Sequence, residues 1–287
     1  MKDFDGESVL ANSIRGRSLD ITKLVLEAES NLNKNADLNT TDADGSTPLA
    51  AAIMKGDLEM AILLLEHGAD FQSTCGRWGN AFNAAVIQGA MATNTLLDNG
   101  ASITNTDQHG RGPMHMVGVV GDLDLFNQFL MADPDGCVRK DKQGRTVLHY
   151  AASRGHQSMV EKILAVEPCM VADRDGWTPL HWACRPSNNE DVVQVLLAHG
   201  GNPSVKAANG WIAQDVAVFH ENSEMLLKAL DRFENEKVGE ERGLVQREKR
   251  EKRHRKGRTL FVQGRPRRNG IPADISCDGC YCVSIGS

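Results

Sequence analysis

The stretch that decides the fold is Asp175-Gly176-Trp177-Thr178-Pro179-Leu180-His181-Trp182-Ala183, because less exact copies of it recur along the chain of 287 residues. Its apolar position recurs at steps of 39, 33, 32, 34 and 32 residues. A repeat of this length predicts a solenoid, since one unit cannot bury its own apolar face and has to stack on its neighbours. In chain order this position holds Leu10, Leu49, Phe82, Met114, Leu148 and Leu180.

Each copy has the pattern of a turn followed by two short helices. Gly176 suits a hairpin turn that needs a positive φ angle. Thr178 can cap the first helix, and Pro179 suits the first helical position, where a missing backbone N–H is tolerated. A second glycine, such as Gly155 in the preceding copy, is expected to end that helix. An adjacent pair of apolar residues then marks the second helix.

These residues resemble the ankyrin repeat, whose signature combines a Gly-x-Thr-Pro-Leu-His-x-Ala-Ala run, a mid-repeat Gly, a Leu-Leu pair and a closing Gly-Ala. The resemblance covers residues 5–232 and implies an all-α ankyrin-repeat solenoid of helix-turn-helix units with short β-hairpin fingers. The third copy lacks both Thr and Pro, and its Trp-Gly-Asn-Ala-Phe-Asn form looks like a variant of long fungal ankyrin arrays. The resemblance places repeats at 5–40, 42–74, 75–106, 107–139, 141–173 and 174–206, and a degraded end cap at 207–232.

Charge divides the chain into two parts. Residues 1–233 hold 19 Lys and Arg against 30 Asp and Glu, a net charge of −11, while residues 234–287 hold 13 against 8, a net charge of +5. Beyond Phe233, Glu, Lys and Arg dominate and large apolar residues become few. This composition predicts a charged C-terminal tail that is mostly disordered or helical, with a linker at 233–270 and an incomplete Cys-rich segment at 271–287.

Cysteine usage and hydropathy indicate the compartment. The seven cysteines form no disulfide framework, and no signal peptide precedes them. A reducing environment is expected, which means a cytoplasmic or nuclear location. No apolar stretch approaches the length of a membrane span, so a membrane is not an expected partner.

The basic run from Arg247 to Arg258 could act as a nuclear-import signal or contact nucleic acid. Against these functions, Glu248 and Glu251 stand four residues before Lys252 and Arg255, which is the spacing of helix-stabilising ion pairs. No aromatic residue interrupts the run, so bases would find no ring to stack on. We favour a solvated charged helix and do not expect a nucleic-acid partner.

Cys277 and Cys280 form a Cys-x-x-Cys pair, which can supply two thiolates to one zinc ion. The segment resembles the opening of a ZZ-type zinc finger, which continues with further Cys pairs and a His pair. A closed structural zinc site needs four ligands, and the chain stops at Ser287 before the later ones. No cofactor is therefore expected, and zinc would bind only if the motif were completed.

His115, His149 and His181 occupy one register of the repeat, where they could act as metal ligands or as general bases. The ankyrin resemblance implies instead that this histidine ties together backbone groups of the turn, and we favour that structural role. No histidine stands beside a Ser or Cys nucleophile, and no phosphate-binding Gly-x-x-x-x-Gly-Lys loop occurs. The chain is not expected to be an enzyme.

The residue after each turn glycine is the candidate binding position. In an ankyrin stack this position projects toward the concave groove, and Arg and Trp are the residue types that anchor protein interfaces. The competing interpretation is that the tryptophans pack on neighbouring hairpins and the arginines are solvated. The candidate residues are Arg111, Arg145, Trp177 and Trp211, with Arg154 and Arg185 at the ends of first helices extending the same surface.

These observations predict a non-catalytic scaffold that binds a protein partner through the concave groove of the ankyrin stack. The alternative is a nuclear or nucleic-acid-associated regulatory protein that acts through its basic, Cys-containing tail. A ligand-binding enzyme regulator is a third class, but no pocket chemistry in the sequence supports it.

Overall fold

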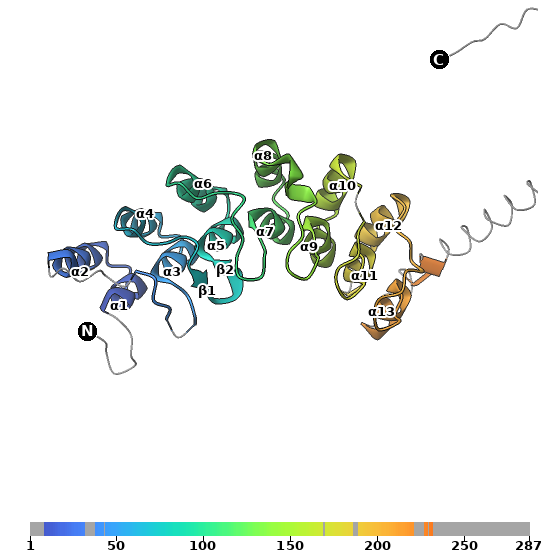
Figure 1. The fold of residues 1–287 in the computed structure, drawn as a ribbon, viewed down its shortest axis with the longest axis horizontal. Helices are drawn as coiled ribbons and strands as arrows, with labels where there is room; N and C mark the ends of the chain where they lie inside the picture. Colours follow the sequence, from blue (N-terminus) through green and yellow to red (C-terminus); the bar gives the residue numbers. More distant parts are fainter. Residues whose placement is uncertain are drawn as a thin grey trace, which may run out of the picture. The chain divides into compact units, whose positions relative to one another are not determined.

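The computed structural model describes residues 9–31, 38–42, 44–168, 170–185, 189–220, 227–228 and 230–231, all within one compact unit, Met1–Asn235. In this part of the chain the helices form two rows (Figure 1), because the two helices of a repeat pack on each other and the first-row helices pack on the first-row helices of neighbouring repeats. This arrangement confirms the predicted all-α solenoid of helix-turn-helix units.

The helices alternate between the rows along the chain. The first row contains α1 (Val9–Arg15), α3 (Pro48–Met54), α5 (Ala81–Gln88), α7 (Pro113–Val120), α9 (Val147–Arg154), α11 (Pro179–Ala183) and α13 (Ala213–Phe219). The second row contains α2 (Leu19–Asn31), α4 (Leu58–Glu66), α6 (Ala90–Asp98), α8 (Leu123–Ala132), α10 (Gln157–Val166) and α12 (Glu190–Ala198). Two short 3₁₀ helices are η1 (Gly76–Trp78) and η2 (Pro134–Cys137).

The helix-start residues act as the sequence predicts. Thr47 caps α3 by accepting a hydrogen bond from the backbone N–H of Ala50, and Pro48 occupies the first turn of that helix. Thr178 and Pro179 have the same positions at the start of α11. At the other end, Gly155 follows α9 in the left-handed conformation with φ of 77°, which a residue with a side chain rarely adopts.

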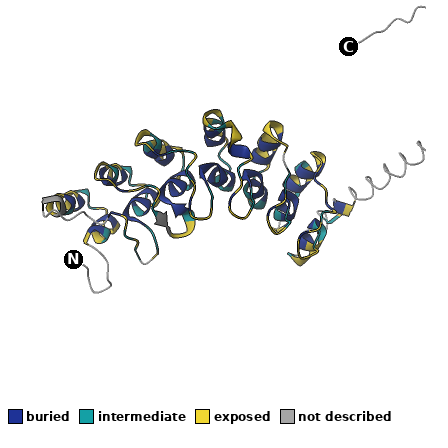
Figure 2. Ribbon diagram, viewed as in Figure 1, coloured by how far each residue is buried: buried dark blue, intermediate teal, exposed yellow. Residues whose placement is uncertain are grey.

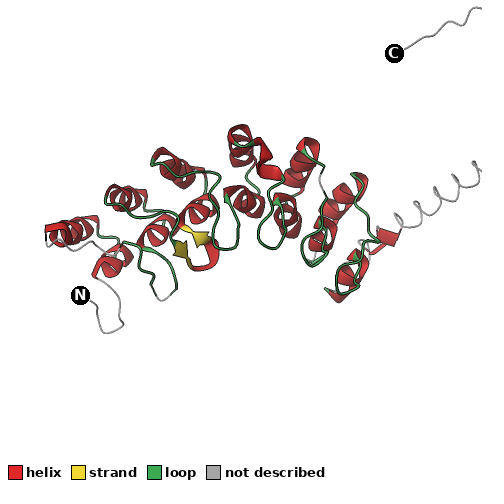
Figure 3. Cartoon of the chain, viewed as in Figure 1, coloured by secondary structure: helices red, strands yellow, loops and turns green. Residues whose placement is uncertain are grey.

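The fingers between repeats are simpler than predicted. Among the described residues the only strand pair is β1 (Thr74–Cys75) with β2 (Gly79–Asn80), antiparallel with Thr74 opposite Asn80 (Figure 3). The other described fingers are turns without a ladder. Each is held by an Asp or Asn side chain, and neighbouring fingers are joined by single backbone bonds such as Lys142 N–H to the His109 carbonyl.

The core lies between the two rows (Figure 2). All six recurring apolar positions are buried, from Leu49 at 0% exposed to Met114 at 6%, which confirms the predicted register. Small residues allow the first-row helices to approach closely. At Gly118 in α7, an added Cβ would lie 2.7 Å from the backbone carbonyl oxygen of Val147 at the start of α9.

Two predictions about the rest of the chain remain as they were. The exact repeat boundaries stay predictions, and the linker at 233–270 and the Cys-rich segment at 271–287 lie outside the described residues. Among the helices that are described, none combines the length and the apolar composition needed to cross a bilayer.

Candidate protein-binding cleft

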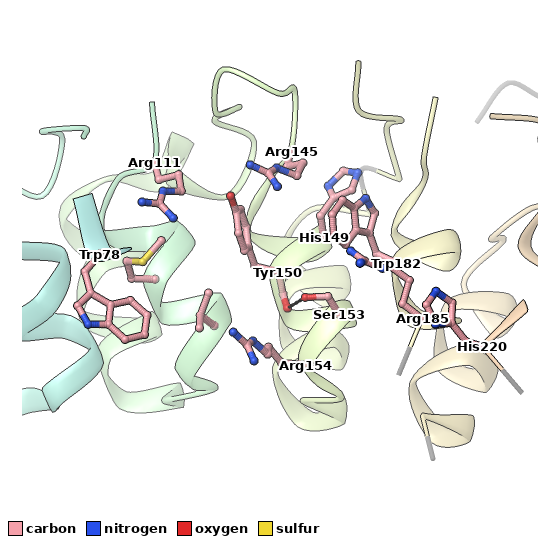
Figure 4. Close-up of a pocket in the computed structure, with 12 residues that line it drawn as sticks. Trp78, Arg111, Arg145, His149, Tyr150, Ser153, Arg154, Trp182, Arg185 and His220 are labelled. Atoms are coloured by element: carbon pink, nitrogen blue, oxygen red, sulfur yellow. Dashed lines mark hydrogen bonds between the residues drawn. The ribbon is translucent and has the colours of Figure 1, made fainter. Parts of the chain in front are cut away.

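A cleft of about 400 Å³ runs across the first-row helices α7, α9 and α11 and the fingers that precede α7 and α9. Four of the six predicted site residues line it: Arg111, Arg145, Arg154 and Arg185. Figure 4 shows them together with the aromatic rings that share the cleft. The remaining lining residues are Trp78, Met116, Val119, His149, Tyr150, Ser153, Trp182 and His220.

Arg111 and Arg145 are held in place by buried aspartates. Arg111 pairs with Asp107 at 2.7 Å, and Arg145 pairs with Asp141 at 2.8 Å, with both carboxylate side chains 0% exposed. Burial alone would raise the pKa of Asp141, but hydrogen bonds from Tyr150 and Arg145 outweigh it and lower that pKa. Both arginines therefore line the cleft with their positive charge neutralised by a buried carboxylate.

In the next repeat the buried aspartate accepts its side-chain hydrogen bond from a different residue type. Asp173 accepts a hydrogen bond from Nε1 of Trp182 at 3.0 Å, in the place that an arginine takes in the two preceding repeats. The Trp177 ring is half-buried and packs against the rings of Trp182 and His181, with centroids 5.8 and 5.9 Å apart. Trp177 and Trp211 are not among the cleft-lining residues, and their role in binding stays a prediction.

Arg154 and Arg185 carry the unbalanced charge of the cleft. Both side chains are exposed, and within the described part of the chain neither has a carboxylate at ion-pair distance. The guanidinium carbon of Arg185 lies 4.9 Å from the centre of the Trp182 ring and 5.9 Å from that of Trp177. Stacking on a ring orients this guanidinium without using its N–H groups.

Sequence reasoning missed four lining residues that carry rings, namely Trp78, Tyr150, Trp182 and His220. A signal existed for two of them, because Tyr150 and Trp182 both directly follow the repeat histidine and so share a register. Trp78 comes from the atypical third finger and His220 from the end of α13, so no repeat register links them to the others.

The repeat histidines have the structural role that was predicted. His149 accepts the backbone N–H of Thr146 at Nδ1, 3.0 Å away, so Nε2 carries the proton and donates to the carbonyl of Trp177 at 3.3 Å. His115 and His181 make the equivalent bonds in their own repeats. Burial lowers the pKa of all three, and that of His149 to about 4. Because both ring nitrogens are hydrogen-bonded, these histidines connect one finger to the next and are not available as bases or metal ligands.

Metal chemistry finds no support among the residues that are described. They contain no group of three or more His, Cys, Asp and Glu side chains able to hold a metal ion. The thiols of Cys137 and Cys184 are buried, which raises their pKa to about 11 and about 12. Cys277 and Cys280 lie outside the described residues, so zinc binding by that pair stays a prediction.

Comparison with known proteins supports the resemblance to ankyrin repeats. A family model described as "Ankyrin repeats (3 copies)" matches residues 1–75 and 114–207. The chain is 30% identical over 206 residues to ankyrin repeat domain-containing protein SAT10 of Stachybotrys chartarum, covering 62% of this chain but 10% of that protein. It is also 30% identical over 190 residues to the putative ankyrin repeat protein YahD of Escherichia coli, covering 62% of this chain and 93% of that protein.

Among solved structures, the human ASB11 ankyrin repeat domain superposes with a TM-score of 0.60 at 22% identity, covering 79% of this chain and 98% of that domain. At this identity the likeness shows the fold alone. Ankyrin repeats are in general modules for protein–protein interaction, and domains built from them are typically non-enzymatic. The family model and the two relatives together establish that the chain belongs to the ankyrin repeat family.

Proposed function

We propose that this protein is a non-catalytic interaction module that binds a protein partner in the cleft over α7, α9 and α11. The observation that carries the proposal is the pair Arg154 and Arg185, two exposed arginines that line the cleft without an acidic partner among the described residues. Arg185 also lies over the ring of Trp182. Arg, Trp and Tyr are the residue types that dominate binding energy at protein interfaces. The module needs no cofactor and acts in the cytoplasm or nucleus.

Rigidity of the cleft supports this function. Tyr150 and Trp182 donate hydrogen bonds to Asp141 and Asp173, so their rings are fixed before a partner arrives. The same aspartates each accept two backbone N–H groups of their own finger, which ties the rings to the turn. Side chains that are already ordered lose little conformational entropy on binding, so more of the contact energy remains as affinity.

Affinity capture tests the proposal. Full-length protein, the double variant Arg154→Ala/Arg185→Ala and the control Lys162→Ala are used as bait, and bound proteins are identified by mass spectrometry. Lys162 is an exposed cation on α10 in the second row, away from the cleft. We expect one partner to bind the wild type and the control equally and to bind the double variant more weakly by about 2 kcal/mol, or about 30-fold.

A partner recovered equally by the double variant and the wild type would contradict the proposal, provided that both proteins have the same thermal midpoint. Deleting residues 234–287 separates the alternative function. If the partner is lost with the tail and kept by the double variant, the basic tail carries the recognition.

Trp177 provides a further prediction. Because its ring packs on Trp182 and His181, we expect Trp177→Ala to lower the thermal midpoint. The free energy of unfolding should fall by about 1–3 kcal/mol, as for the loss of a half-buried aromatic ring. Affinity for a captured partner should stay unchanged, because the ring does not line the cleft. Melting and affinity are measured on the same preparation. A loss of affinity with an unchanged midpoint would instead make Trp177 an interface anchor.

A further inference from the structure

The sign of the charge in the cleft is opposite to that of the molecule around it. The lining includes four arginines and no Asp or Glu side chain. The carboxylates that balance Arg111 and Arg145 are fully buried beneath them, so a partner meets the guanidinium groups and not the acids. Residues 1–233 carry a net charge of −11. The cleft is therefore a basic site on an acidic domain, and an acidic segment is attracted there and repelled elsewhere.

The arginines present the geometry that carboxylates need. Arg185 stacks on Trp182, and the guanidinium carbon of Arg145 lies 5.2 Å from the ring centre of Tyr150 and 5.7 Å from that of Trp182. The guanidinium edge of Arg145 is already used on Asp141. Arg185 has no carboxylate partner among the described residues, so its edge can donate two parallel N–H bonds to a carboxylate of a ligand.

The same contacts disfavour nucleic acid as the occupant. Base stacking requires open ring faces, whereas arginines lie over the rings of Tyr150 and Trp182. The net charge of −11 on residues 1–233 also opposes a long polyanion, while a short segment with a few carboxylates can engage the cleft alone.

Resting on the function proposed above, we propose that the cleft binds an extended acidic peptide segment of the partner, with two of its carboxylates paired to Arg154 and Arg185. Arg154 is the last residue of α9, and Arg185 lies two residues after the end of α11, which packs on α9. Packed helix axes lie about 8–10 Å apart. A polyproline II peptide advances about 9 Å in three residues and brings its side chains back to one face at that interval. The expected ligand therefore carries Asp or Glu at positions i and i+3.

Fluorescence anisotropy with the full-length protein tests this. The probe is a fluorescein-labelled peptide with a Glu-Pro-Pro-Glu core, and the reference is the same peptide with Gln-Pro-Pro-Gln. We expect the Gln peptide to bind at least about tenfold more weakly, because each lost charged pair is a hot-spot contact. Arg154→Ala and Arg185→Ala each remove one of the two pairs and should each weaken the Glu peptide about fivefold, while Lys162→Ala leaves it unchanged. Added salt should weaken the Glu peptide more than the Gln peptide.

Several outcomes overturn the proposal. Equal binding of the Glu and Gln peptides would show that the carboxylates do not contribute to affinity. Displacement of the probe by inorganic phosphate at the same concentration as unlabelled peptide shows a small-anion site, and binding of a phosphoserine peptide but not of the Glu peptide shows a phosphopeptide site. If no peptide binds while capture of a protein partner still depends on Arg154 and Arg185, the interaction module stands and the acidic segment is wrong.

Discussion

Leu180→Ala is expected to lower the free energy of unfolding by about 2–5 kcal/mol, the usual result of truncating a buried leucine when the cavity does not collapse. The Leu180 side chain is 2% exposed and lies in α11, which packs on α9, α12 and α13. Because a solenoid has only neighbour contacts, the void left at α11 weakens the interfaces on both of its sides. Urea unfolding followed by far-UV circular dichroism, extrapolated to water, measures the change.

Met131→Ala provides the matched control for this truncation. Met131 is also a large apolar residue in a helix, but it is 86% exposed in α8, so its removal should change the free energy of unfolding by less than about 0.5 kcal/mol. If Leu180→Ala behaves like Met131→Ala, Leu180 is not a core residue and the register of the whole repeat is wrong.

The fold could be predicted because its determinants are local and periodic. The step between apolar anchors, the Thr and Pro at helix starts and the glycine at helix ends each act within one repeat, so Leu148, Thr146 and Gly155 could be assigned without knowing the neighbouring repeats. The β-hairpin fingers were predicted for every repeat, but the described residues contain one strand pair. The sequence shows a turn without showing how many backbone bonds close it.

The cleft could be predicted only in part, because it depends on which side chains meet after stacking. Arg111 and Arg145 share a register, so their alignment follows from the repeat. The buried partner of each is four residues earlier, a local spacing that could have been noticed in the sequence. Trp177 shares that register as well, yet its ring packs against Trp182 and does not line the cleft.

The different behaviour of Trp177 follows from its side chain, which has no guanidinium to pair with the aspartate of its finger. In two repeats the aspartate carboxylate pairs with the arginine of its own finger, which fixes that side chain over the cleft. In the third, Asp173 is occupied by Nε1 of Trp182, and the Trp177 ring packs on this indole. A single register can thus place a side chain in the cleft or pack it against a neighbouring ring.

Acidification is expected to destabilise the solenoid between pH 6.5 and about pH 4 through its buried histidines. Burial lowers the pKa of His149 to about 4 from an ordinary value of 6.5, although Asp173 and the Trp177 carbonyl act in the opposite direction. Between these pH values the unfolded chain binds a proton that the folded chain excludes. The stability contributed by neutral His149 is therefore complete above pH 6.5 and is lost as the pH falls toward 4. A pKa lowered from 6.5 to about 4 corresponds to about 3 kcal/mol.

His149→Asn isolates this histidine, because the chain already carries an asparagine in the same register. Asn83 is buried and donates from Nδ2 to the carbonyl of Arg111 at 3.2 Å, so the side chain can bridge to the next finger without titrating. We expect the variant to be less stable than the wild type at pH 7 and to lose less stability on acidification. His115 and His181 remain in both proteins, so their lowered pKa values cancel in the difference. Chemical unfolding at a series of pH values measures the two slopes, and parallel slopes would mean that His149 takes up its proton at the same pH in the folded and the unfolded chain.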